Sequence, residues 1–440
     1  PTKNITDVAA AKQALTRFTS KAFRRPVRQV ELDGLVRLFR QQRKNGLPYA
    51  AALRISIKAA LISPGFLFRI DETAPSKSGP EPLDAYTLAS RMSYFVWSSM
   101  PDAELMKLAA TGKLHEPAIL AAQTKRMIKD PKIKALAVEF GANWLDIRRF
   151  EEHSAVDRER FPAFDDNLRQ AMFDEPVRFI MDGLQSNTSI LDWLYGKHTF
   201  VNGPLAKHYG MDDLKVPDDI LNDPKQWFRV DNADRYSRGG ILPMAAFLTK
   251  NASGLRTSPV RRGYWMVKRV LGEYIPPPPA VVPELPKDEK ALGDKTLRQA
   301  LSQHRDNPAC SGCHARFDSY GLVFEGFGPI GELRKFDQGG KPVDTAAPFP
   351  GGVEKSGVAG LQEYIKTKRQ QDFLDTFARK MTTYALGRTL QPSDDLLLTN
   401  IQTRLRTTDY KIGSMIEAIV NSRQFRYRRA SISTTVANKE

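Results

Sequence analysis

The two cysteines of the chain and the histidine that follows the second one form a compact cluster of reactive side chains. They lie in the pentapeptide Cys310-Ser311-Gly312-Cys313-His314. In a helix, residues separated by three and four positions share one face. Two thiols on that face can bond to the two vinyl groups of a porphyrin while the imidazole binds its iron, and C-x-x-C-H is the attachment pattern of c-type haem. The sequence therefore predicts one covalent haem c on Cys310 and Cys313, with His314 as an iron ligand.

Two other uses of paired cysteines fit the sequence less well. A thioredoxin-like dithiol also has the C-x-x-C spacing, but it belongs in an α/β context, and the sequence around this motif is helical in pattern. A zinc site would need two further ligands, and the chain has only 2 cysteines. The sequence also lacks an H-E-x-x-H metal motif, a phosphate-binding glycine loop and a nucleophile elbow.

The elements that must position this motif are helices, because apolar residues recur at helical spacing along most of the chain. We expect a mainly α fold, in which a large multi-helix unit is followed by a small cytochrome c-like helical haem domain. Helices are predicted at 7–20, 28–40, 48–63, 116–129, 131–148, 164–185, 296–304 and 371–387, with two more before the C-terminus.

Composition breaks divide the helical pattern into four parts. We expect an N-terminal helical unit at 1–72, a large helical unit at 83–275, and a haem domain with the closing helices at 293–440. Four consecutive prolines begin the segment 276–292, which is predicted to be an extended linker because proline cannot continue a helix.

Local signals near the motif predict how the chain enters and leaves it. Asn307 followed by Pro308 is a helix-start signal, which places both thiols and His314 in the first two turns of a helix. A glycine-rich loop of about fifty residues is expected to follow. Upstream, the segments Arg238-Gly239-Gly240 and Arg261-Arg262-Gly263 are interpreted as turns or caps beside helices.

The net charge of the chain limits the kinds of partner that it is expected to bind. Lys and Arg number 66 against 50 Asp and Glu, which gives a formal net charge of +16. Such a surface either serves solvation or faces an acidic redox partner, the other subunits of a complex or an anionic membrane surface. Nucleic acid is not expected as a partner, because the basic residues are spread along the whole chain and no nucleic-acid module is recognisable. No apolar run approaches the roughly 18 residues of a membrane span.

Several segments together resemble one known family. The haem block runs from His304 to His314 and continues at Asp318, Gly321, Glu325 and Arg334; the other matching segments are Ser93–Asp102, Val201–Asn202, Leu205–Gly210, Thr257–Gly263 and Tyr384–Arg388. On these residues the chain resembles the secreted domain-of-unknown-function family associated with planctomycete cytochromes. The resemblance implies the same haem assignment, and it implies no particular reaction.

The second axial position of the iron has three candidates. The loop from Ala315 to Gln370 contains no Met and no His, so it supplies no thioether. His208 and His304 lie in segments that match the family, and imidazole is the commonest metal ligand. Met381 lies on the apolar stripe of the 371–387 helix, where a core role is favoured. We expect either two imidazole ligands or an open position.

These observations favour electron transfer outside the cytoplasm, in the periplasm or beyond, where covalent haem attachment takes place in bacteria. The chain would act as a mono-haem cytochrome within a larger redox assembly. Two alternatives stay open at this point. The roughly 290 residues before the haem motif could enclose a substrate, as in a peroxidase or an oxidase of an organic compound, or they could serve as a docking scaffold.

Overall fold

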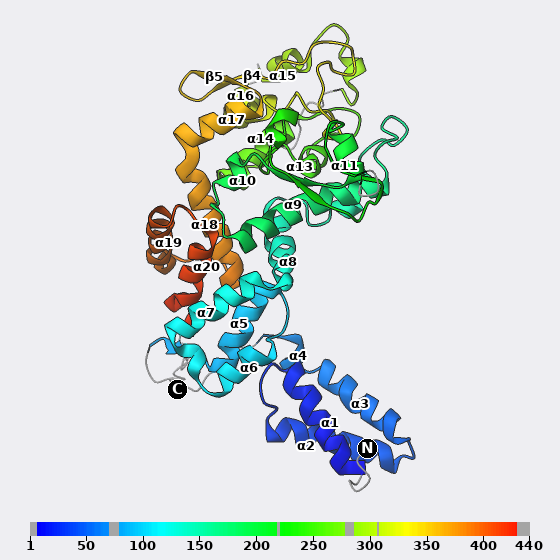
Figure 1. The fold of residues 1–440 in the computed structure, drawn as a ribbon, viewed down its shortest axis with the longest axis vertical. Helices are drawn as coiled ribbons and strands as arrows, with labels where there is room; N and C mark the ends of the chain where they lie inside the picture. The colour runs from blue at the N-terminus through cyan, green and yellow to red at the C-terminus, as the bar shows by residue number, and fades with distance from the viewer. Residues whose placement is uncertain (1–6, 70–78, 218–220, 278–285, 306–307, 429–440) are drawn as a thin grey trace, which may run out of the picture. The chain divides into compact units, whose positions relative to one another are not determined.

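The computed structural model describes residues 7–69, 79–217, 221–277, 286–305 and 308–428, without the side chains of 303–305 and 308–309. This part of the chain is mainly α, which confirms the predicted fold class (Figure 1). Its strands form three antiparallel pairs, β1 with β6, β2 with β3 and β4 with β5. None of the described helices combines the length and the apolar character that crossing a membrane requires.

The chain divides into two compact units. The first comprises residues Pro1–Lys132 and Ile416–Glu440, and the second comprises Ile133–Met415. The second unit thus contains residues from both sides of the segment 276–292, which the sequence predicts to be a linker. Within that segment, residues 278–285 lie outside the described part of the chain.

The first unit contains two groups of helices. The elements are α1 (Asp7–Ala22), α2 (Gln29–Lys44), α3 (Tyr49–Leu61), α4 (Pro64–Leu67), β1 (Glu81–Pro82), α5 (Ala85–Trp97), α6 (Ala103–Ala110), α7 (Pro117–Lys129), α21 (Arg423–Arg426) and β6 (Tyr427–Arg428). Helices α1 to α3 pack through the predicted apolar stripes, with Ala11 against Phe39 and Leu15 against Leu32. Asp84 begins α5 by accepting hydrogen bonds from two backbone amides of the first turn.

The second unit holds the haem motif. Its main elements are α8 (Lys134–Leu136), η3 (Ala137–Ala142), α9 (Asp166–Ser186), α10 (Asp192–Tyr195), β2 (Thr199–Val201), α11 (Gly203–His208), β3 (Phe228–Val230), α13 (Ala245–Lys250), α14 (Pro259–Trp265), η6 (Met266–Val270), η7 (Glu289–Leu292), α15 (Leu297–Arg305), α16 (Pro308–Leu322), β4 (Ala346–Phe349), β5 (Val353–Ser356), α17 (Gly357–Tyr364), η8 (Ile365–Arg369), α18 (Gln370–Leu386) and α19 (Asp395–Thr407). Helix α20 (Ile412–Asn421) spans the boundary between the units.

An aromatic cluster forms the core of this unit around α18. The ring centroid of Phe377 lies 5.1 Å from that of Trp144 and 5.1 Å from that of Trp193, in both cases edge to face. Such edge-to-face pairs add about 0.5–1.5 kcal/mol each beyond the burial of their area. Trp144 and Trp193, which are 3% and 1% exposed, are therefore core residues.

Two local predictions near these helices are wrong. The segment 131–148 is not one regular helix, because it passes through a 3-10 turn (Pro131–Ile133) and a π turn (Ala137–Ala142). The glycine-rich segment after the motif is not one long loop either. Helix α16 continues to Leu322, and the hairpin β4–β5 and α17 follow before Gln370.

Candidate haem site

Helix α16 carries the three motif residues on its inward face. Cys310 and His314 are each 8% exposed, and Cys313 is half-buried. Ser311 and Gly312, which lie between them in the sequence, are exposed. The two thiols are not joined to each other. Cys310, Cys313 and His314 thus occupy positions i, i+3 and i+4 of a single helix, which lie on the same face of that helix.

The imidazole of His314 is held by a carboxylate one turn further along α16. Its Nδ1 lies 2.9 Å from Oδ1 of Asp318, and Asp318 is only 2% exposed. The ring centroid of His314 also lies 5.0 Å from that of Phe317. Since Nδ1 is engaged with Asp318, Nε2 is the nitrogen through which His314 would bind a metal.

A close helix crossing fixes the position of α16. A Cβ atom on Gly263 of α14 would lie 2.1 Å from the carbonyl oxygen of Phe317, and one on Gly321 would lie 1.8 Å from that of Pro259. Both distances are far below van der Waals contact, so the two backbones touch where the glycines face each other. Figure 1 shows α14 and α16 side by side. This crossing explains why glycine occupies both positions.

The segment that leaves α16 is clamped by a buried arginine. Arg262, on α14, is fully buried, and its guanidinium donates hydrogen bonds to the carbonyl oxygens of Phe324 (3.0 Å), Phe327 (2.7 Å) and Gly328 (2.7 Å). It also donates to the carbonyl of Leu248 on α13 (3.2 Å). Burial lowers the pKa of Arg262 to about 10, which leaves it charged at neutral pH. Its interpretation as a turn or cap residue is therefore wrong.

Two more basic side chains hold the end of this segment. Arg238 is 4% exposed and donates to the carbonyl oxygens of Gly331 (2.7 Å) and Pro243 (2.6 Å). Nε2 of His208 lies 2.9 Å from the carbonyl oxygen of Ile330. Burial and the nearby charge of Arg238 lower the pKa of His208 to about 4, so the imidazole is neutral and Nε2 donates. Arg238, Arg262 and His208 together fix residues 324–331.

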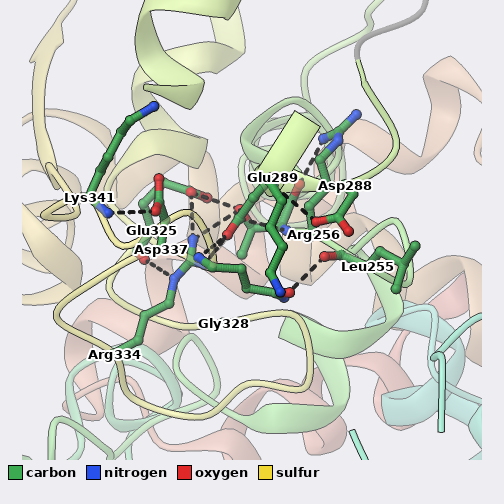
Figure 2. A network of polar contacts seen from close by, with 12 residues as sticks. Leu255, Arg256, Asp288, Glu289, Glu325, Gly328, Arg334, Asp337 and Lys341 are labelled. Carbon is green, nitrogen blue, oxygen red and sulfur yellow. Dashed lines mark hydrogen bonds and ion pairs between the residues drawn. The ribbon is translucent and has the colours of Figure 1, made fainter. Parts of the chain in front are cut away.

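A network of ion pairs ties the same segment to the residues that follow the proline run (Figure 2). Arg334 contacts both carboxylate oxygens of Glu289 at 3.0 and 2.8 Å, and its other terminal nitrogen lies 3.0 Å from Glu325. The hydroxyl of Thr257, just before α14, donates to Glu325 (2.7 Å). Glu289, which lies near the end of the predicted linker segment, is 2% exposed.

The two carboxylates of this network have opposite pKa shifts. Burial raises the pKa of Glu325, against the opposing attraction of Arg334 and Arg262. Burial also acts to raise the pKa of Glu289, but the charge and hydrogen bonds of Arg334 outweigh it and hold the pKa below its ordinary value. Arg334 and Glu289 thus form an ionised pair at neutral pH. Paired, hydrogen-bonded charges of this kind fix geometry more than they add stability.

The three candidates for the second axial position lie on different helices, α11, α15 and α18. His208 is engaged with Ile330, as described above. Met381 is fully buried on α18, on the same helical stripe as Phe377 of the aromatic cluster. His304 lies on α15, but its side chain is outside the described part of the chain.

The donor set on α16 fits a covalently attached haem. In that arrangement the thiols bond to the porphyrin and only the imidazole contacts iron, so the three groups need not converge on one point. A bare ion would require such convergence. Among the described residues, no three His, Cys, Asp or Glu side chains are placed to hold a metal ion.

Four family models match consecutive parts of the chain. Each is described as a protein of unknown function: DUF1595 at residues 10–71, DUF1592 at 83–211, DUF1588 at 238–337 and DUF1585 at 351–425. These are families associated with planctomycete cytochromes. The matches support the family that the sequence resembles. No curated protein and no solved structure matches the chain.

The DUF1588 match contains the motif and most of the groups that hold it. It begins at Arg238, includes Arg262, Glu325 and Arg334, and runs across the predicted linker. The positioning roles of Arg238 and Arg262 escaped prediction, because an arginine beside glycine is ordinarily a surface or turn residue. The segments around Arg262 and Glu325 resemble the family. This resemblance indicated that these residues matter, but it did not indicate what they do.

Proposed function

We propose that this chain is an extracytoplasmic mono-haem c-type cytochrome that transfers electrons as a subunit of a larger redox assembly. In this proposal Cys310 and Cys313 form thioether bonds to the haem, and His314 binds its iron through Nε2. The observation that carries the proposal is the placement of two thiols and an imidazole on the inward face of α16. The match to cytochrome-associated families supports it.

The contacts that hold α16 in place support the proposal. When bound, the haem supplies a one-electron couple, and the protein determines its position and its environment. The contact of Gly263 with Gly321 and the hydrogen bonds of Arg262 fix α16 and its exit segment. A rigid site reduces the reorganisation that accompanies a change of charge, because fixed dipoles need not reorient. The inward-facing thiols would hold the haem against the protein.

Covalent attachment is the direct test. We expect the denatured wild-type protein, expressed with a c-type haem maturation system, to stain for haem on a gel. Cys310→Ala and Cys313→Ala should each reduce the staining strongly, because each removes one thioether. Ser311→Ala is the matched control, since Ser311 lies between the two cysteines and is exposed. A colourless wild-type band would overturn the proposal.

The second axial position is part of the same proposal. We infer that Met381 does not bind the iron, because it is buried on the stripe of α18 that carries Phe377. A second imidazole or an open position would then be expected, and either would lower the potential of the haem relative to Met and His ligation. The ferric near-infrared spectrum tests this. A methionine-to-iron charge-transfer band that disappears in Met381→Ala would contradict the inference.

The charge of the chain supports an acidic partner. With a net charge of +16, the protein should associate with an acidic redox protein or complex through long-range attraction. Screening shortens the reach of that attraction to about 8 Å at physiological ionic strength. The affinity for an acidic cytochrome or for anionic vesicles should therefore fall steeply as salt is raised. An affinity that does not change with salt would mean that the charge only solvates the surface.

A further inference from the structure

The bond between His314 and Asp318 has features that a surface ion pair lacks. Both residues lie on α16, four positions apart, and both are almost completely buried. Nδ1 and Oδ1 are 2.9 Å apart, which is the ordinary length of a hydrogen bond to a charged acceptor. A buried carboxylate is costly unless it is hydrogen-bonded, so its presence beside the motif histidine requires an explanation.

The carboxylate determines which nitrogen of His314 carries the proton. A carboxylate oxygen accepts hydrogen bonds, so the contact of Oδ1 favours the tautomer in which Nδ1 donates and Nε2 keeps the lone pair. Phe317 adds a contact to the ring at 5.0 Å between centroids. The imidazole is thus held in one tautomer with one orientation. Metal-binding histidines are commonly fixed in this way, and the same hydrogen bond makes the ring more basic.

The helix under this pair is itself held rigidly. Gly321 lies one turn beyond Asp318 and contacts the carbonyl of Pro259 through its backbone. Downstream, Arg262 holds the carbonyls of Phe324 and Phe327. These contacts leave α16 little freedom to shift along its axis. The position of the Asp318 carboxylate relative to His314 is therefore set before any ligand binds, as a positioning group requires.

We propose that Asp318 is a positioning residue for the iron ligand, which holds His314 with Nε2 toward the metal and lowers the reduction potential of the haem. This inference rests on the proposed haem function. The buried negative charge reaches the iron through the imidazole, which it makes a stronger electron donor. Ferric iron carries one positive charge more than ferrous iron, so the stronger donor stabilises the ferric form more.

The substitution Asp318→Asn isolates the charge. Asparagine has the same shape and keeps an oxygen that can accept from Nδ1, but it is neutral. We expect the variant to retain covalent haem on a denaturing gel. Its ferric form should lose at least about tenfold in stability relative to the ferrous form, which raises the potential by about 59 mV for a one-electron couple. Asp318→Glu keeps the charge and should have a potential closer to that of the wild type.

A second buried carboxylate provides the matched control. Asp394 is fully buried and pairs with Arg388 (2.7 Å), and it lies between α18 and α19 rather than on the motif helix. Asp394→Asn should lower the thermal stability and leave the potential unchanged. Spectroelectrochemical titration of the purified haem-bearing proteins gives the potentials. Thermal unfolding, followed by circular dichroism, gives the stabilities.

The outcomes separate this inference from the proposed function. A wild type that carries no haem overturns both. A haem-bearing wild type whose potential is the same as that of Asp318→Asn overturns the role of Asp318 alone, even if the variant is less stable. An upward shift of similar size in Asp394→Asn would also overturn it, because the change would then reflect a general loss of packing. An upward shift in Asp318→Asn alone supports it.

Discussion

Removal of the Arg262 guanidinium should destabilise the second unit more than the loss of any surface arginine. This side chain is fully buried and donates to backbone carbonyls of Leu248, Phe324, Phe327 and Gly328. Arg262→Met keeps an apolar stem of similar reach but removes every donor. The four carbonyls then lose a charged partner in an environment from which water is excluded.

The size of the effect follows from these contacts. A buried acceptor left unsatisfied costs about 1–3 kcal/mol, and the removal of one partner from a buried charged group typically costs about 3–5 kcal/mol. Burial holds the pKa of Arg262 down to about 10, so its contacts do not fully offset the desolvation of the guanidinium. Removal of the guanidinium therefore also removes part of this desolvation cost, which makes the net loss of stability smaller. We therefore expect Arg262→Met to lower the free energy of unfolding by about 4 kcal/mol and the melting temperature by roughly 10 °C.

Two measurements check this expectation. Thermal unfolding gives the shift in melting temperature, and hydrogen exchange followed by mass spectrometry gives the protection of residues 322–334. We expect protection of that segment to fall in Arg262→Met, because its carbonyls are the ones that lose their partners. The melting temperature of Arg262→Lys should lie between those of Arg262→Met and the wild type. A lysine ammonium is a compact charge that cannot reach all the carbonyls that the planar guanidinium binds.

The exposed Arg235 offers the matched control. It contacts Asp213 with half of its side chain in solvent, so Arg235→Met should change the stability by less than about 0.5 kcal/mol. A loss below about 1 kcal/mol in Arg262→Met would refute the reasoning, because it would place the hydrogen bonds of Arg262 within the range of surface contacts.

Other predictions follow from the same unit. Gly263→Ala places a Cβ atom 2.1 Å from a carbonyl oxygen of α16 and should destabilise by about 3 kcal/mol in urea unfolding, whereas Gly312→Ala has open space and should be neutral or stabilising. Burial raises the pKa of Glu175 to about 7, so the folded state binds its proton more tightly than the unfolded state does. The stability that the bound proton of Glu175 contributes is complete below pH 4.5, and it is lost as the pH rises to 7. The stability of the wild type minus that of Glu175→Gln should therefore fall by about 3 kcal/mol over this range, and a flat difference would contradict the shift. His208 has the opposite effect, because its pKa is lowered to about 4: the stability of the wild type minus that of His208→Gln should rise between pH 4 and 6.5.

The features that the sequence predicted correctly depend on neighbouring residues. The stripe of Leu32 and Val36 predicts α2 because a helix returns to the same face every 3.6 residues, whatever lies opposite. Pro308 begins α16 where the local signal placed the helix start. The spacing of Cys310 and His314 fixes their common face once that helix forms. Helical spacing and helix starts depend only on residues that are close in the sequence, so they can be predicted from the sequence alone.

The features that escaped prediction depend on residues distant in the sequence. Arg262 is a clamp because Phe324 and Gly328 come within hydrogen-bonding distance of it, 62 and 66 positions further along the chain. Gly263 and Gly321 are required because two backbones touch there, which neither local sequence reveals. The hairpin β4–β5 likewise lies in a segment whose glycines predicted a loop.

The sequence by itself thus determined that the chain is helical and which three side chains form the candidate haem site. Only the tertiary structure decided what holds that site in place, namely the glycine crossing of α14 with α16 and the buried side chain of Arg262. The physical reason is that helical periodicity and the C-x-x-C-H spacing are satisfied within a few turns of one segment. The role of a buried charge or of a glycine at a close contact depends on a partner from a distant part of the sequence, so it cannot be predicted from the neighbouring residues.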